Sequence, residues 1–426
     1  MTFPRIILAG CLTLCAAGLL AQERVIELKS ANELRGREIA GEEVRELIGN
    51  VHFVQPTSGG GLVKVWCQRA LRYMKQNKVE LFGNVRIVRD SVTLRAEEGV
   101  YYGKEQRARL DRGVQLQRGG RILNAAVGDY FTQEKRAEFA GSVVVQDSVS
   151  ETRCDRLTYF EEDDCSIATG NVKIISPQNN TTVFGDSLVH FEKQGYTIVP
   201  KNPLFMQVDT TSTGIVDTLL IQSRVMEAFQ DTSRRFIASE EVVVVRSDVA
   251  ARCQRATYLT RDERIILQGE PVVWHAERQI TGDSIVVGLR DRRLNSVYVE
   301  GRAMAVSRAD TLRPHRFDQL TGRIIRMYFE DDELRRVEVD RTATSLYYLY
   351  DGDRPNGANR SSGDKIFIDF RDRKVDRIKI IGGVEGRYFP EEMLARRERE
   401  FNLDGFQWRT DRPRRQHLEI VSSLHE

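Results

Sequence analysis

The sequence predicts an elongated, all-β protein built from repeated pairs of strands. A Gly-Asn-Val segment followed by alternating apolar residues occurs at 49–51, 83–85 and 170–172. Aligning segments of this type places a Val every 29 residues over one stretch, at Val85, Val114, Val143 and Val172. Self-similarity at a fixed period of this size is typical of repeat architectures, in which each unit buries its apolar face against its neighbours.

A second recurring segment lies between the Val-containing ones. It begins with a small residue and an acidic or polar residue, and its fourth and sixth positions are mostly apolar or aromatic, as in AEEGVY from Ala96 and CDRLTY from Cys154. With weaker copies, its first residues fall at 31, 67, 96, 125, 154, 185, 223, 253, 282, 322 and 363. We therefore expect about eleven units of two strands, and if each unit adds one layer, a body of about 50 Å.

Apolar and charged side chains alternate within both segments. Val85 and Ile87 share one parity, while Arg86 faces the other way. Because successive side chains of a strand point to opposite faces, one face should be apolar and the other solvated. The predicted inward-facing residues are Val85, Ile87, Tyr101, Val114, Leu116, Tyr130, Val143, Val145, Leu157, Tyr159, Val172, Ile174 and Leu188.

The repeat is expected to fall into two groups of units. Residues 200–213 (PKNPLFMQVDTTST) are irregular and are expected to form a loop or hinge between N-terminal units at 22–199 and C-terminal units at 214–389. Helix-forming residues follow Pro390 (EEMLARRERE), so 390–426 is expected to be a short helix with a basic, loose tail. Such a segment caps a repeat stack, or it docks to a partner or to acidic lipid headgroups.

The N-terminus has the order of a secretory signal peptide. Arg5 precedes an apolar run at 6–21, which ends in small residues before a polar segment, so cleavage is expected near Ala21. The run is shorter than a membrane-spanning helix requires. Leu8 to Cys11 resembles a lipoprotein cleavage box, which leaves lipidation of Cys11 as an alternative. The mature chain is therefore expected in the periplasm.

Composition and motifs predict no catalytic, metal or cofactor site. The 64 Lys and Arg residues nearly balance 62 Asp and Glu, so no nucleic-acid partner is predicted. None of the six histidines forms a zinc-protease motif, and no nucleotide-binding glycine loop is found. The acids that recur in the second segment, such as Asp155, Asp186 and Asp283, fit a structural role in every unit better than a pair of catalytic carboxylates.

The cysteines are predicted to be unpaired. Cys67, Cys154 and Cys253 occupy the small-residue position of the second segment, which indicates packing rather than redox chemistry. A hairpin turning at 161–164 would place Cys154 and Cys165 too far apart for a disulfide.

The alternating segments resemble the OstA family of lipopolysaccharide-transport proteins, which includes LptA, the periplasmic part of LptC and the N-terminal domain of LptD. The best matches are Cys154 to Tyr159 followed by Ala168 to Ile174, and Ala96 to Tyr101 followed by Gly113 to Leu116. The resemblance spans about 31–388. It implies an open β-jelly roll, in which two antiparallel sheets face each other across an apolar interior that receives acyl chains. The length is most similar to that of the long OstA-like periplasmic proteins.

The resemblance implies a non-enzymatic periplasmic carrier or bridge that shields lipopolysaccharide acyl chains in an apolar β-trough during transport to the outer membrane. The inward-facing residues named above are then the predicted lipid-binding residues. The expected partners are lipopolysaccharide or another acylated lipid, and related jelly-roll proteins or further copies of the chain joined end to end by strand addition. One alternative is a structural β-repeat scaffold whose interior is a filled core. Another is a carbohydrate-active β-solenoid, which would need a cluster of acids on an exposed face.

Overall fold

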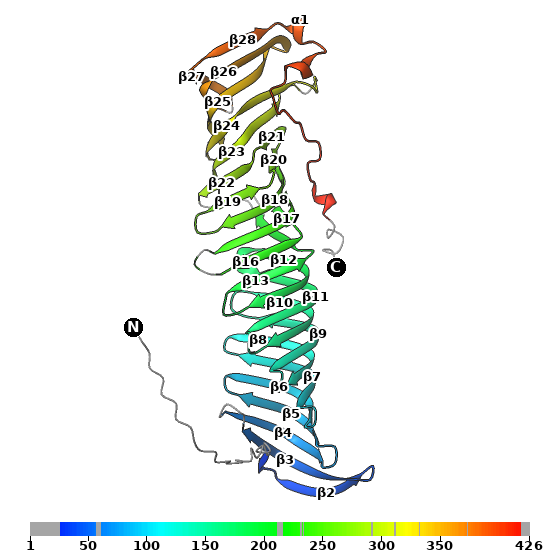
Figure 1. Cartoon of the computed structure of the whole chain (residues 1–426). Coiled ribbons are helices and arrows are strands. Elements are labelled where there is room, and N and C mark those ends of the chain that lie inside the picture. Colours follow the sequence, from blue (N-terminus) through cyan, green and yellow to red (C-terminus); the bar gives the residue numbers. More distant parts are fainter. Residues whose placement is uncertain are drawn as a thin grey trace, which may run out of the picture.

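The computed structural model describes residues 26–56, 61–210, 216–230, 232, 234–290, 293–310, 312–331, 333–372 and 374–418. These residues form an elongated column of antiparallel strands (Figure 1). The predicted signal peptide, its cleavage near Ala21 and the lipidation of Cys11 lie outside the described residues. Within them, no helix has the length and apolar character needed to cross a membrane.

The strands follow one another along the chain in a single continuous sheet. They are β1 (Glu27–Ser30), β2 (Glu33–Ile39), β3 (Glu42–Pro56), β4 (Leu62–Tyr73), β5 (Lys78–Arg89), β6 (Val92–Tyr102), β7 (Arg107–Arg118), β8 (Arg121–Phe131), β9 (Arg136–Gln146), β10 (Glu151–Phe160), β11 (Cys165–Ser176), β12 (Thr181–Phe191), β13 (Tyr196–Lys201), β14 (Leu204–Thr210), β15 (Val216–Gln222), β16 (Val225–Phe229), β17 (Arg235–Val245), β18 (Val249–Leu259), β19 (Arg264–Gln268), β20 (Val272–His275), β21 (Arg278–Thr281), β22 (Ser284–Arg290), β23 (Arg293–Arg308), β24 (Phe317–Glu330), β25 (Glu333–Asp351), β26 (Arg354–Arg371), β27 (Lys374–Ile381) and β28 (Glu385–Phe389).

Long strands bend near the middle, and in alternate long strands the corner is made by two consecutive residues with positive φ. In β5 these residues are Gly83 (φ 74°) and Asn84 (φ 49°). Glycine adopts this conformation without a Cβ penalty, and asparagine is among the few other residues that tolerate it. The two corner residues of β5 lie opposite the single residue Glu97 of β6, so the register shifts there. The repeated Gly-Asn-Val segment therefore marks the corner of a strand.

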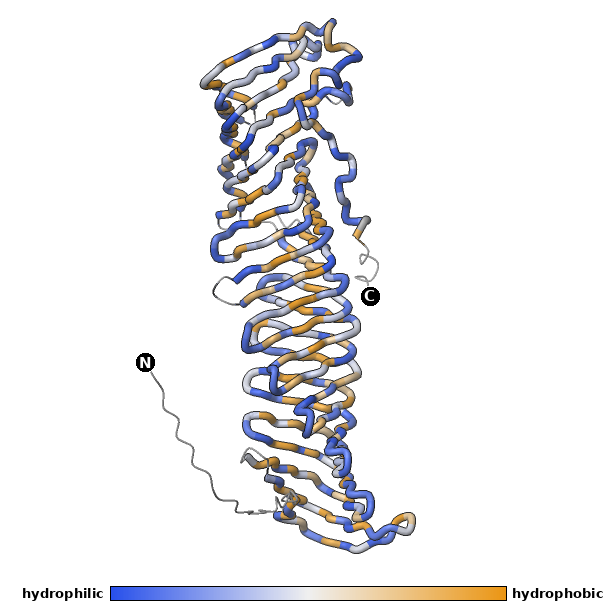
Figure 2. Tube along the Cα trace, in the orientation of Figure 1, coloured by the Kyte–Doolittle hydropathy of each residue, from blue (hydrophilic) through white to orange (hydrophobic). Residues whose placement is uncertain are grey.

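The corners divide the sheet into two walls. Wall A contains the strand halves on the Val85 side of the corners, such as 85–89 and 92–96, and wall B contains the other halves, such as 78–82 and 98–102. One apolar cluster runs along both walls over nearly the whole column, from Leu47 to Ile366. Apolar and polar residues alternate along many of the strands, as Figure 2 shows. Together the walls form the antiparallel β-jelly roll that the family resemblance implied.

Six pairs of short strands are the two halves of bent strands. These are β1 with β2, β13 with β14, β15 with β16, β19 with β20, β21 with β22, and β27 with β28, and each pair lies against one common neighbour. Between β19 and β20 the corner is Gly269-Glu270-Pro271, where proline has no N–H for the ladder. The 28 strands therefore make 22 bent strands, which confirms the eleven predicted two-strand units.

The column is longer than the repeat count suggested. Every bent strand adds one layer to both walls, so a unit adds two layers instead of one. At about 4.8 Å per strand, 22 layers give a length of about 100 Å. The expected length of about 50 Å was wrong because the sequence does not reveal that each strand contributes to both walls.

The stretch at 200–213 differs from the loop or hinge that was expected. Its residues 204–210 form β14, which pairs with β12 on one side and β15 on the other. Asn202, with φ of 49°, makes another corner, and Leu204 behind it is fully buried. The ladder therefore continues through this stretch, while residues 211–213 lie outside the described part of the chain.

The C-terminal segment is mostly extended and packs against the outside of wall A. Helix α1 covers only Glu391–Leu394, because Ala395 leaves helical geometry (ψ 119°) and Arg396 has a positive φ of 67°. Short 3-10 turns follow at 398–401 and 415–417. The chain then runs back beside the column (Figure 1). The expected loose tail is therefore wrong up to residue 418, and we call residues 390–418 the strap.

Candidate functional site

The inward-facing residues of the two repeated sequence segments meet at the corners. The Val of one strand is the cross-strand partner of the small residue of the next, as for Val85 with Ala96 and Val143 with Cys154. Val85 is 1% exposed and Val143 is fully buried. The small residues therefore leave room for a continuous row of valines along the inner side of the corners.

The cysteines serve this packing. Cys67, Cys154, Cys165 and Cys253 are free and buried, as the sequence predicted. Burial raises the pKa of Cys154 to about 11 and that of Cys253 to about 12. These thiols therefore stay protonated at neutral pH.

The recurring acids stabilise the outside of the corners. Asn171 donates to Asp155 at 2.9 Å, and Asn202 donates to Asp186 at 2.7 Å. A Cβ on Gly170 would lie 2.3 Å from an oxygen of Asp155, so only glycine leaves space for that carboxylate. The predicted structural role of these acids is confirmed.

The inward-facing residues become more exposed with distance from the corners. Six of the predicted residues are buried, namely Val85, Val114, Val143, Leu157, Val172 and Leu188. Six more are partly buried and pack against the same cluster, namely Ile87, Leu116, Tyr130, Val145, Tyr159 and Ile174. Tyr101 is also partly buried. The interior is thus most buried at the corners and more exposed at the ends of the walls away from them, which we call the mouth. Contact of these residues with lipid stays a prediction.

At the mouth the inward-facing position is occupied by charged residues that the sequence analysis did not single out. On wall A the series Val85, Ile87 ends at Arg89, and on wall B the series Leu157, Tyr159 ends at Glu161. The Arg89 guanidinium donates to the Tyr130 hydroxyl at 2.6 Å and lies 3.4 Å from the Glu161 carboxylate. Because the partners lie on opposite walls, this contact joins wall A to wall B at the mouth.

Two further contacts of the same kind lie along the mouth. Arg118 donates to the Tyr159 hydroxyl at 2.6 Å, and that hydroxyl donates to Asp164 at 2.6 Å. Arg121 pairs with Glu192 at 2.5 Å. Arg118 and Tyr159 each lie 29 residues after Arg89 and Tyr130, so the period itself could have identified them. We call these three sets of contacts the latches.

The latches change the protonation equilibria of their members. Burial, together with the bond to Asp164, raises the pKa of Tyr159 to about 12. The hydrogen bond from Tyr159 in turn lowers the pKa of Asp164. The hydrogen bond from Arg121 lowers the pKa of Glu192. At neutral pH the latches therefore combine arginine cations, neutral tyrosines and carboxylates.

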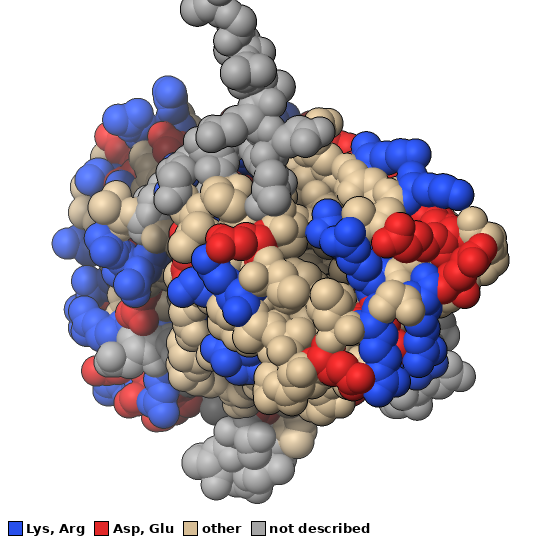
Figure 3. Space-filling model, turned by 90° about the horizontal axis from the view of Figure 1, so that it is seen from below, with Lys and Arg blue, Asp and Glu red and all other residues tan. Residues whose placement is uncertain are grey.

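The outer surface carries both signs of charge. Viewed from below the column, Lys and Arg side chains are interspersed with Asp and Glu side chains (Figure 3). In the described part of the chain, no group of three or more His, Cys, Asp and Glu residues could hold a metal ion.

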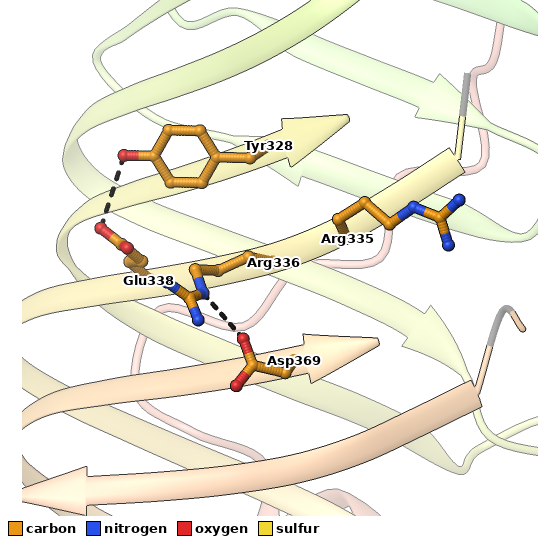
Figure 4. Close-up of a pocket in the computed structure, with 5 residues that line it drawn as sticks. All are labelled: Tyr328, Arg335, Arg336, Glu338 and Asp369. Carbon is orange, nitrogen blue, oxygen red and sulfur yellow. Dashed lines mark hydrogen bonds and ion pairs between the residues drawn. The ribbon is translucent and has the colours of Figure 1, made fainter. Parts of the chain in front are cut away.

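Described residues form two surface pockets. One, of about 380 Å³, is lined by Tyr328, Arg336, Glu338 and Asp369, which form paired contacts, and by Arg335, which extends away from them (Figure 4). The other, of about 220 Å³, lies at a corner beside Arg409 of the strap. Both have charged linings, which do not suit an acyl chain.

Comparisons with known proteins agree with this architecture. The family model for OstA-like protein matches residues 23–139, and the model for the LptA/(LptD N-terminal domain) LPS transport protein matches residues 151–292. Residues 23–139 and 151–292 are therefore similar to OstA-like and LptA-type lipopolysaccharide-transport proteins. These two segments span the described strands from β1 to β22, apart from the end of β9, and the same bent strands continue beyond them.

The comparisons with solved structures and with curated sequences give weaker similarity than the family models. LptH from Pseudomonas aeruginosa, the LptA-homologous periplasmic component of its lipopolysaccharide transport device, is 15% identical. That similarity covers 33% of this chain and 95% of LptH, with a TM-score of 0.26. No curated protein matches the chain.

Proposed function

We propose that this OstA-like chain is a periplasmic carrier or bridge that shields lipopolysaccharide acyl chains between its two walls during transport to the outer membrane. The observation that carries the proposal is the inward-facing lining, which is apolar in unit after unit and becomes partly exposed toward the mouth. The similarity of residues 23–139 and 151–292 to lipopolysaccharide-transport proteins supports the ligand class.

The energetics suit a carrier. Burial of each acyl CH₂ group is worth about 0.8 kcal/mol, and a trough of about 100 Å offers apolar surface along its whole length. No bond has to be broken for transport along such a surface.

The partly buried residues are the ones that would contact lipid. The corner valines are packed, so they form the floor, while Ile87, Leu116, Val145 and Ile174 lie farther up wall A. Acyl chains would enter by separating the walls at the mouth and packing against these side chains.

The ends of the column suit strand addition. Among the described strands, β1 and β2 pair only with β3, and β27 and β28 pair only with β26, so each end has a free edge. Leu34 near one edge is 61% exposed, and Ile378 near the other is 50% exposed. A related jelly roll or a second copy of the chain would extend both the ladder and the trough.

Site-specific photo-crosslinking in cells tests the carrier proposal. A photoreactive residue at Val145, which faces inward, should form lipopolysaccharide adducts. The same residue at Val144, its outward-facing neighbour on β9, is the matched control and should form few. Equal yields at the two positions, or none at Val145 when crosslinks form elsewhere in the chain, would reject the proposal.

A structural scaffold is the second candidate, and the fully buried corners together with the latches favour it, because both describe a closed interior. Replacing Val145 and Ile174, which are both only partly buried, by Asp separates the two. A carrier should lose lipid capture with little unfolding, whereas a filled core should unfold because of the buried charges. The antiparallel pairing throughout the column does not fit a β-solenoid of parallel coils.

A further inference from the structure

We propose that Arg118 and Arg121, with Arg89 one unit away, form a binding site for the anionic headgroup of the amphiphile whose acyl chains occupy the trough. This proposal rests on the carrier function above. It adds a chemical class to the ligand, since it requires phosphate-type charge next to the chains.

The first step is the placement of the three side chains. Each is the outermost inward-facing residue of its half-strand in wall A, two positions beyond Leu116, Leu123 and Ile87, respectively. A headgroup would occupy this position if its acyl chains lay against those apolar residues. The side chains of Arg89, Arg118 and Arg121 are 35%, 52% and 43% exposed, so an incoming anion can reach them.

The second step is the pairing of Arg118 with Arg121. The two residues are direct cross-strand partners at the end of the β7–β8 hairpin. Like charges in this arrangement destabilise a sheet unless anions compensate them. Two guanidinium groups on one side of a hairpin present several N–H donors, and such groups suit the oxygens of a phosphate.

The third step is the source of compensation when the mouth is closed. Asp164 and Glu192 supply the negative charge for the pair, Glu161 does so for Arg89, and all three carboxylates belong to wall B. Asp90, beside Arg89, lies at 3.8 Å. Ion pairs with this degree of exposure contribute little to stability, so a competing anion can displace them.

The fourth step couples the headgroup to the chains. Acyl chains that enter between the walls move wall B away from wall A, so the arginines lose their carboxylate partners. A phosphate headgroup replaces those wall B carboxylates, whereas an uncharged headgroup leaves Arg118 and Arg121 without them. Arg89, Arg118 and Arg121, which we call the rim, should therefore select anionic amphiphiles over neutral ones with the same chains.

The test compares phosphatidic acid with diacylglycerol of identical chains, which differ only in the phosphate. Binding to the purified mature chain is measured by displacement of a fluorescent acyl probe. The wild type should bind phosphatidic acid at least tenfold more tightly. The double variant Arg118→Gln with Arg121→Gln should lose this preference, while its affinity for diacylglycerol is kept or increased.

Arg95→Gln is the matched control, because Arg95 lies on the outward-facing side of wall A in the adjacent strand β6 and bonds to Gln115. It should keep the preference, and hydrogen exchange of β7 and β8 should show that the double variant remains folded.

Five outcomes would overturn the proposed headgroup site. If the wild type binds both lipids with the same affinity, the carrier proposal is kept and the headgroup site is rejected. If the double variant keeps the preference, or if it loses affinity for both lipids equally, the arginines do not bind the phosphate of the headgroup. If inorganic phosphate alone binds as tightly as phosphatidic acid, the site is a free-anion site. If neither lipid displaces the probe, the carrier and the rim both fall.

Discussion

The two ends of wall A share one inner face but have different outer faces. In the N-terminal units the outward-facing residues include Arg86, Arg95, Gln115 and Lys173, which face solvent or make polar contacts. In the C-terminal units the corresponding face is apolar and buried under the strap. Its residues include Leu204, Leu220, Val245, Val272, Trp274, Met304, Val306 and Phe317.

The strap binds this face through both apolar and polar contacts. Leu403 and Leu418 are buried against it. Gln279 donates to the backbone carbonyl of Gln407 at 2.7 Å and accepts from the backbone N–H of Arg409 at 2.8 Å. Arg316, which is 2% exposed at its side chain, pairs with Glu391 at 2.5 Å. The C-terminal part of wall A is therefore supported from outside by a second core.

This difference shows that the repeat fixes only the corner residues and the inward-facing positions of each strand. The outward-facing positions are free to vary. They divide the column into a C-terminal half that the strap supports and an N-terminal half whose walls are joined at the mouth by the latches. In the C-terminal half, ion pairs such as Arg246–Asp217 and Arg308–Glu277 join neighbouring strands of the same wall. We infer that wall A resists local opening more strongly in the C-terminal half, where the strap supports it from outside.

The largest expected effect comes from the second core. Trp274 is 2% exposed and donates to the Arg409 carbonyl at 3.3 Å, so Trp274→Ala should cost about 3–5 kcal/mol locally. Trp66 occupies the same outer face in the N-terminal half, where it stacks on His52 at 4.7 Å and lies beneath Arg86. Trp66→Ala should cost about 1 kcal/mol, because its surroundings are less buried.

Hydrogen exchange resolves these local effects, since stability in a repeat array is not uniform. Protection should fall in β18, β20 and β21 for Trp274→Ala, and only around β3 to β5 for Trp66→Ala. Equal losses in the two variants would contradict the distinction between the outer faces.

The corners test the feature that both halves share. Gly170 in the N-terminal half and Gly301 in the C-terminal half have positive φ, and a Cβ on either would lie within 2.4 Å of an Asp carboxylate oxygen. Replacement by Ala should cost about 1–2 kcal/mol for the left-handed backbone, with a further cost for moving the carboxylate.

Gly113→Ala is the control for this pair. Gly113 also has positive φ, but nothing lies within 4 Å of its Cβ position, so only the backbone cost applies. Thermal unfolding should give similar shifts for Gly170→Ala and Gly301→Ala and a smaller one for Gly113→Ala. A shift confined to one half would mean that the corners are not equivalent.

The sequence predicted what is local and periodic. The 29-residue period and the alternation of Val85, Arg86 and Ile87 were enough for the strand pairs, the inner face and the packing role of the cysteines. The corner acids followed from their repetition, since a residue needed in every layer is a structural one.

Features that depend on contacts distant in sequence could not be predicted. The packing of Leu418 against Leu204 joins segments more than 200 residues apart. The stretch Leu204, Phe205, Met206 is apolar on both parities because the trough cluster covers one side and the outer core the other. Without knowledge of the strap, that stretch has no strand-like alternation, which is why a loop was expected there.

The latches should affect the width of the mouth more than stability. Arg118 is half exposed, so Arg118→Ala should cost less than about 1 kcal/mol. Spin labels on cysteines at Gly120 of wall A and Asp163 of wall B should show a broader, longer distance distribution in this variant. Arg95→Ala is the control and should leave the distribution unchanged. The native thiols should not compete for the label, because burial raises their pKa.

Acid should open the same mouth without any substitution. The pKa of Asp164 is lowered by its bond to Tyr159, and that of Glu192 by its bond to Arg121. A carboxyl whose folded-state pKa lies below its unfolded value, about 3.9 for Asp and 4.3 for Glu, stabilises the folded state above the unfolded pKa. That stability is lost as pH falls through the folded pKa.

The label distance at Gly120 and Asp163 should therefore stay constant from pH 7 to about pH 5 and lengthen below about pH 4. The groups that face the two carboxylates are Tyr159, Arg118 and Lys193 around Asp164, and Arg121 and His190 around Glu192. The variant Asp164→Asn with Glu192→Gln should already show the longer distance at pH 7 and change little on acidification. If acid lengthened the distance equally in this variant, the opening would have to come from carboxylates elsewhere, and the mouth of the N-terminal half would not depend on the latches.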